Sequence, residues 1–186
     1  MAHTAVRVAA GVALVLTASA LAGCAPSIDS LVRDNLAGGV EEVQDTLWEY
    51  RDQIARDPEA AVAGLDFLGD ARAGAVEGAR PYTLVDLESA ADGATLTLVV
   101  RGGATTGGGL WAEQALALTC VDFVFPRAVD EIRVEEAACT DVPDIRSDEE
   151  IVPFRDLPVR ESVTAADYPP PICQCHSGGD CDCPGG

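Results

Sequence analysis

An unbroken apolar run near the N-terminus is the feature that most constrains this chain, because it decides where the rest of the chain folds. Residues 8–22 carry no charge and follow a short opening segment whose only formal side-chain charge is Arg7. A membrane-spanning helix needs about 20 apolar residues, whereas this run stops at Gly23 and Cys24. The pattern is typical of a cleaved export signal. We therefore expect the remainder of the chain to fold outside the cytoplasm.

The end of that run, Leu21-Ala22-Gly23-Cys24, resembles the lipobox of bacterial lipoproteins. The resemblance covers residues 1–24 and implies cleavage between Gly23 and Cys24, with lipid on the Cys24 thiol. Two or three acyl chains on one residue give stable membrane anchoring, whereas one chain binds only marginally. The alternative is an ordinary secretory signal followed by a chance cysteine. We expect a signal peptide over 1–23, a lipidated N-terminus over 24–26, and a lipid-anchored protein on the extracytoplasmic face of the cell membrane.

The charge of the chain restricts its partners. The net charge is −19, and removal of the leader makes it one unit more negative because only Arg7 is lost. Such an acidic surface repels nucleic acid and anionic lipid head groups, so we expect no nucleic-acid partner. An envelope protein, a cation or a neutral wall component remains open. Every basic residue is Arg, and Ala and Gly are abundant, a composition typical of high-GC bacteria such as actinobacteria.

Periodicity predicts helices in the first part of the mature chain. Apolar residues recur at spacings of three and four from Leu36 to Ile54, which indicates one face of an amphipathic helix. The stripe extends back to Ile28, and two adjacent glycines, Gly38 and Gly39, favour a kink or a break within it. This face would pack on the domain's own sheet or, alternatively, bind a partner. Asp57-Pro58 predicts the start of a second, shorter helix that ends near Gly69.

From residue 81 onward the pattern changes to that of strands. We expect a strand from Tyr82, a hairpin turn at Asp92-Gly93, a second strand through residues 95–100, a long strand within 110–125 and a last strand from Ile132. The Gly-rich segment 102–109 lacks the Gly-Lys-Ser/Thr ending of a phosphate-binding loop, so a hairpin loop is favoured. The sequence thus predicts an α+β domain, residues 27–142, with helices on one face of an antiparallel meander.

The remaining cysteines predict disulfides. Six cysteines are left once Cys24 carries lipid, and an even number outside the cytoplasm favours bridges. A hairpin turn at Val129 and Asp130 would place Cys120 opposite Cys139 and close a loop worth about 3 kcal/mol of stability. The other four thiols lie in a tail, residues 173–186, after an acidic, Pro-rich linker over 143–172: Cys173, Cys175, Cys181 and Cys183.

That tail also allows a different interpretation. Its four thiols and His176 could converge on Zn²⁺ or Cu(I), although the spacing departs from that of regular structural zinc sites. We favour two disulfides that link the first cysteine pair to the second, so no cofactor is expected, and metal binding or redox activity of the tail is the alternative function.

The sequence singles out no catalytic group. A Ser-His-Asp arrangement needs a positioned imidazole, and the mature chain holds only His176, on the tail. No spacing distinguishes a pair of carboxylates. Trp48 and Trp111 could line a ligand surface, although aromatic residues in periodic segments are more often core. We therefore expect a non-enzymatic binding or interaction module.

Overall fold

The computed structural model describes residues 26–65, 82–108, 111–140, 142 and 145–169, and the backbone of 174–175 and 181–182. The helices come first: α2 (Ile28–Trp48), α3 (Arg51–Arg56) and α4 (Pro58–Gly64). The main sheet contains β1 (Tyr82–Ala90), β2 (Gly93–Thr106), β3 (Glu113–Pro126), β4 (Glu131–Glu136), β5 (Glu149–Ile151) and β6 (Ser162–Thr164). A short 3-10 helix, η3 (Phe154–Asp156), precedes β6, and a separate two-stranded ladder joins β7 (Gln174–Cys175) to β8 (Cys181–Asp182).

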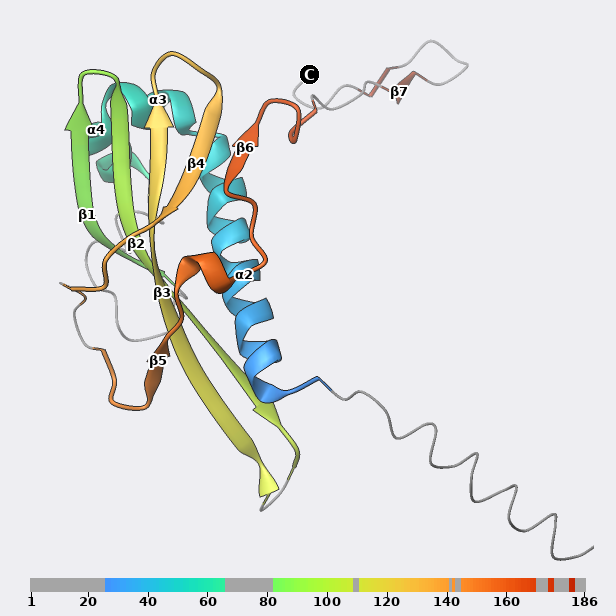
Figure 1. Ribbon diagram of the computed structural model, residues 1–186. Coiled ribbons are helices and arrows are strands. Elements are labelled where there is room, and N and C mark those ends of the chain that lie inside the picture. The colour runs from blue at the N-terminus through green and yellow to red at the C-terminus, as the bar shows by residue number, and fades with distance from the viewer. Residues whose placement is uncertain are drawn as a thin grey trace, which may run out of the picture.

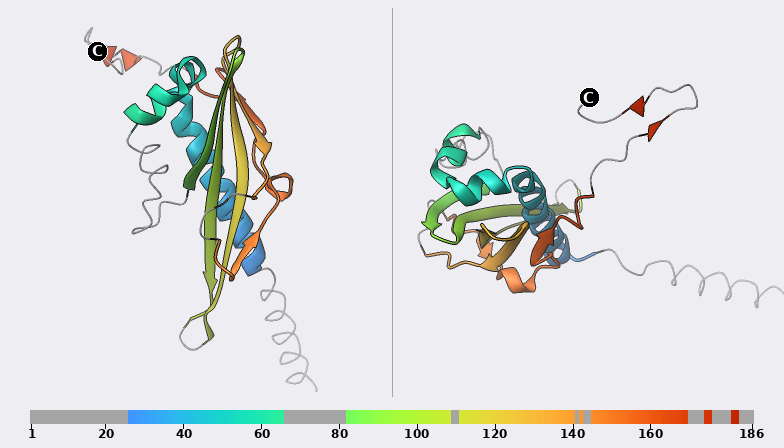
Figure 2. Two further views of the ribbon diagram at one scale, coloured as in Figure 1. Left: turned by 90° about the vertical axis from the view of Figure 1, so that its left-hand side faces the viewer. Right: turned by 90° about the horizontal axis from the view of Figure 1, so that it is seen from above.

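The structure is α+β, as the sequence predicts. The strand order is β1-β2-β3-β4-β6, and β5 pairs in parallel with β3 beside that path. The helices α2, α3 and α4 lie together on one face of the sheet (Figures 1 and 2). Alternation places Leu96, Leu98 and Val100 on the helix face of β2, where all three are fully buried. Strand β3 adds Phe123 and Phe125 to the same core.

Helix α2 is continuous over its 21 residues, so the expected break at Gly38 and Gly39 is wrong. Its N-terminus is capped by Ser27, whose side chain accepts a hydrogen bond from the amide of Ser30. The apolar stripe faces the sheet and is buried; it includes Leu36, Val40, Val43 and Leu47. This face of the helix therefore packs on the domain's own sheet. Packing on the sheet offsets the helix-propensity cost of the two glycines.

The chain turns at Tyr50, so Ile54 belongs to α3 and not to a longer first helix. Asp57 then caps α4 by accepting a hydrogen bond from the amide of Ala60, and Pro58 occupies the first turn, as predicted. This helix ends at Gly64, and Leu65 after it has an extended backbone, so the expected end near Gly69 is wrong. Between β1 and β2, the turn is formed by Ala91 and Asp92, and Gly93 already pairs with Ala90.

The predicted solvated linker over 143–172 is wrong for residues 149–168. Strand β5 adds to β3 and strand β6 adds to β4, so this segment completes the sheet. Its apolar side chains at Val152, Phe154 and Val163 are buried in the main core. The domain therefore extends well beyond the expected boundary at 142, because burial of these side chains outweighs the local preference of prolines and acidic residues for solvent.

A buried carboxylate fixes the start of this returning segment. Glu149 has a side chain that is only 5% exposed, and its Oε1 lies 3.3 Å from Nε of Arg101 on β2. Its other oxygen accepts the backbone amide of Arg146 at 3.0 Å. Both oxygens of a desolvated carboxylate are thus partnered, as burial of a charge requires.

The first part of the Gly-rich segment, expected to be a loop, belongs to strand β2. Strand β2 continues through Thr106, which pairs with Glu113, so residues 102–106 belong to a long two-stranded ribbon. Gly102 lies against the helix, and a Cβ at that position would stand 3.1 Å from Leu36 Cγ. Close approach of backbone and helix explains why glycine is required at this crossing.

Candidate functional site

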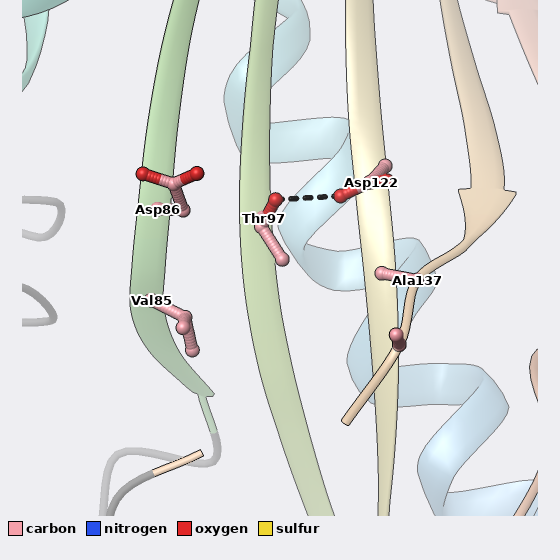
Figure 3. A pocket seen from close by; sticks show the side chains of 6 residues that line it. Val85, Asp86, Thr97, Asp122 and Ala137 are labelled. Atoms are coloured by element: carbon pink, nitrogen blue, oxygen red, sulfur yellow. Dashed lines mark hydrogen bonds between the residues drawn. The ribbon is translucent and has the colours of Figure 1, made fainter. Parts of the chain in front are cut away.

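The sheet face opposite the helices carries a shallow depression of about 380 Å³. Figure 3 shows it from that side, with a helix visible behind the sheet. Three polar side chains stand next to one another across neighbouring strands, because Asp86 pairs with Thr97 and Thr97 pairs with Asp122. The register continues onto β4, where Asp122 pairs with Glu135. We call Asp86, Thr97, Asp122 and Glu135 the polar row.

The polar row is partly organised from within. The Thr97 hydroxyl donates a hydrogen bond of 2.6 Å to Oδ1 of Asp122 (Figure 3), which leaves the other carboxylate oxygen available as an acceptor. Asp86 and Glu135 are exposed at the two ends of the row. Three carboxylates on an open surface can accept hydrogen bonds from a cationic or hydroxyl-bearing partner.

Below the polar row, the same face becomes apolar and is covered. Val99, Leu118 and Cys120 form a second, smaller core with the segment that follows β4. A disulfide between Cys120 and Cys139, with the Cα atoms 5.6 Å apart, holds that segment across the sheet. This is the pairing that the sequence favours. The expected strand geometry differs, because β4 ends at Glu136 and Cys139 lies three residues beyond it.

A second cluster holds the C-terminal segment on α2. The Tyr168 ring stacks on Trp48 with the ring centroids 4.6 Å apart, and the Arg51 guanidinium lies 4.2 Å from the centroid of the Trp48 ring. The Tyr168 hydroxyl donates a hydrogen bond to Asp45. Burial and, secondly, this hydrogen bond raise the pKa of Tyr168 well above its usual value. Trp48 is 8% exposed and is therefore a structural residue of the domain.

The other predicted site residues are placed only in part. Gly23, Cys24, Cys173, His176 and Cys183 lie outside the described residues. The backbone register of the small ladder sets Cys175 opposite Cys181. Directly opposed residues in an antiparallel pair have Cα atoms about 4.5–5.5 Å apart, which lies within the range that a disulfide spans.

Among the residues that the structure describes, no group of three or more His, Cys, Asp or Glu side chains could hold a metal ion. Within the same residues, no helix has the length and apolar character needed to cross a membrane.

Comparison of the chain with protein-family models, with curated proteins and with solved structures finds no match. The domain is therefore classified by its structure, as an α+β domain with helices on one face of an antiparallel sheet.

The polar row is not among the sites expected from the sequence, and Trp111 does not lie in the core as aromatic residues in periodic segments more often do. Asp86, Thr97 and Asp122 each occupy the outward position of a predicted strand, and that alternation is visible in the sequence. Their alignment depends on register, which the turns set. Trp111 lies at the end of the β2–β3 ribbon and is 88% exposed, so it is not a core residue.

Proposed function

We propose that this protein is a lipid-anchored component of a bacterial cell envelope that acts as a non-enzymatic interaction module. The observation that carries the anchoring is the lipobox-like cysteine placed directly ahead of the folded domain. Helix α2 begins at Ile28, four residues after Cys24. Such a short connection would hold the domain against the membrane, since each residue spans at most about 3.6 Å.

The anchoring is tested by the fate of Cys24. Wild type and Cys24→Ser are expressed in a bacterial host with its own lipoprotein pathway, and the membrane fraction is digested and analysed by mass spectrometry. A mature N-terminus at Cys24 with the mass of attached acyl chains supports the proposal. An intact leader, or a soluble mature protein with an unmodified Cys24, overturns it.

The interaction surface is assigned to the open face of the sheet. The polar row gives that face three carboxylates, and the next row of the register adds Glu88 at one end and Arg133 toward the other. The shallow depression beside the polar row is also lined by Val85 and Ala137. Acidic carboxylates around a small apolar floor fit a partner segment that carries positive charge. Thr95, a neighbour of the polar row on β2, offers a test position. Val129, a half-exposed residue of the β3–β4 turn, offers a control position.

A photo-crosslinking residue at position 95 should yield one dominant adduct in cells, whereas the same residue at position 129 should not. Asp86→Asn with Asp122→Asn should remove that adduct while leaving the melting temperature nearly unchanged, since Asp86 is exposed and Asp122 remains a hydrogen-bond acceptor as Asn. Equal crosslinking at both positions, or an adduct that survives the double substitution, overturns the assignment of the face.

The alternative function is metal binding or redox activity of the tail. The backbone register that opposes Cys175 to Cys181 favours disulfides over a metal site. Metal analysis of protein purified with and without reductant separates the two, because a fully oxidised tail without metal eliminates the alternative.

A further inference from the structure

We propose that the end of the β2–β3 ribbon, with Trp111 as its leading side chain, is a second membrane contact that orients the domain on the lipid surface. The proposal rests on the lipid anchor described above and adds to it a specific surface. We call Gly107, Gly108, Trp111 and Ala112, the residues between β2 and β3 that the structure describes, the ribbon tip.

The packing of α2 on β2 places the ribbon tip relative to the lipid anchor. Gly39 lies against Val100 and Leu36 lies against Gly102, so α2 runs antiparallel to β2. Asn35 donates a hydrogen bond of 2.8 Å to the Gly103 carbonyl. From that contact, eight residues of helix back to Ser27 cover about 12 Å, and three residues of strand on to Thr106 cover about 10 Å.

The start of α2 and the end of the β2–β3 ribbon therefore lie at the same end of the molecule, as Figure 1 and the left-hand view of Figure 2 show. Cys24 precedes Pro26 by two residues, a connection of at most about 7 Å. Acyl chains on Cys24 would bring the bilayer to this end of the domain.

The sequence around the ribbon tip differs from the rest of the chain in charge. The chain carries 31 acidic residues against 12 basic ones, yet residues 102–112, Gly-Gly-Ala-Thr-Thr-Gly-Gly-Gly-Leu-Trp-Ala, carry no charge. An acidic surface is repelled by anionic lipids, and an uncharged projection is the part of such a protein that can touch them at low electrostatic cost. Tryptophan is the side chain that prefers the membrane–water interface, because its ring is apolar and its N–H can reach water.

The backbone of the ribbon tip presents Trp111 to solvent. Gly107 has a positive φ of 76°, and a Cβ there would lie 2.6 Å from the Trp111 carbonyl oxygen. The Trp111 amide donates a 3.4 Å hydrogen bond to Gly108. This tight backbone fixes the base of the tip, while the indole side chain points to solvent with 88% of its surface exposed. An aromatic side chain with only two side-chain torsions loses little conformational entropy on insertion.

The nearest acidic residues limit the depth of insertion. Glu113 begins β3 directly after the tip, and Asp29 lies in the first turn of α2. Carboxylates are costly to bury in hydrocarbon, so they hold the contact at head-group depth. The polar row then stands clear of the surface, because Asp122 lies nine residues, about 30 Å, along β3 from Glu113. That separation exceeds the Debye length of about 8 Å at physiological ionic strength.

The test uses the full-length lipidated protein on vesicles of phosphatidylcholine with a minor share of phosphatidylglycerol, both brominated on the acyl chains. The chain contains two tryptophans, and Trp48 is enclosed by its stacking partners. Brominated lipid should quench a large part of the tryptophan fluorescence of wild type, and the wavelength of the fluorescence that remains should shift little. Trp111→Phe should show almost no quenching. Both proteins should bind the vesicles through the anchor.

The matched control moves the fluorophore to the other end of β3. Val129→Trp in the Trp111→Phe background places an exposed indole about 45 Å from the tip, since β3 spans 14 residues. This protein should bind and remain unquenched. Lipidated wild type that binds without quenching, or quenching of equal size at position 129, overturns the tip contact alone. Absence of lipid on Cys24 in the same preparation overturns the anchor and, with it, this inference.

Discussion

The two adjacent glycines of α2 give the sharpest test of how the helix meets the sheet. Gly38 is exposed, and a Cβ added there would meet nothing within 4 Å. A Cβ at Gly39 would stand 3.0 Å from Cγ1 of Val100, which is fully buried on β2. Both positions lie in the interior of the same helix, so the gain in helix propensity from Gly to Ala is shared, at about 1 kcal/mol.

The effects of the two substitutions on the free energy of unfolding should therefore differ only by the cost of packing the added methyl group at Gly39. Gly38→Ala should raise the free energy of unfolding by about 1 kcal/mol, or about 3 °C in melting temperature for a domain of this size. At Gly39 the added methyl must displace a β-branched side chain in a packed core, which costs about 1–3 kcal/mol. Gly39→Ala should thus be neutral or destabilise the domain by up to about 2 kcal/mol.

Urea unfolding followed by circular dichroism measures both values, with equal m-values as the check that the unfolded states are comparable. A double-mutant cycle adds the mechanism: Val100→Ala should destabilise on its own, and Gly39→Ala in that background should become stabilising. Equal stabilisation by both alanines in the wild-type background would show that α2 does not approach β2 as described.

Three further predictions concern groups that hold the domain together. Arg101→Met removes the partner of the buried Glu149 carboxylate and should cost about 3 kcal/mol in urea unfolding; a change below about 0.5 kcal/mol would contradict the buried ion pair. Replacing Cys120 and Cys139 together by Ser should cost about 3 kcal/mol, and an unchanged unfolding midpoint after reduction of wild type would argue against the bridge. The pKa of Tyr168 is raised in the fold, so the neutral phenol contributes its full stabilisation below the unfolded pKa of about 10, and this contribution is lost as the pH rises further. Tyr168→Phe should therefore reduce the loss of unfolding free energy at alkaline pH. An identical pH profile of stability for the variant and wild type would refute the raised pKa.

The elements with a strong period could be predicted from the sequence. The stripe from Val32 to Leu47 has helical spacing, and the alternation through Leu96 and Leu98 has strand spacing, so burial of one face follows directly from each. The cap at Asp57 could also be predicted, since Asp followed by Pro has a local physical meaning.

The returning segment could not be predicted in the same way. Strands β5 and β6 have three residues each, too few to display a period. Their place in the sheet depends on distant partners, among them Arg101 for Glu149 and the core around Phe154. Prolines and acidic residues in this stretch favour solvent locally, and only tertiary contacts reverse that preference.

The two candidate surfaces differ in the same way: one depends on tertiary contacts, and the other has a local signal in the sequence. The polar row exists only because turn lengths bring four outward-facing positions of different strands into one register, so no local signal marks it. The ribbon tip, by contrast, is marked locally by the absence of charge over residues 102–112 in an otherwise acidic chain. What the sequence lacks is the direction in which the tip points. That direction follows from the antiparallel packing of α2 on β2, which brings the uncharged ribbon tip to the end of the domain where α2 begins and leaves the polar row about 30 Å away. An anchored protein with this charge distribution can rest its neutral end on an anionic membrane and keep its acidic face free for a partner.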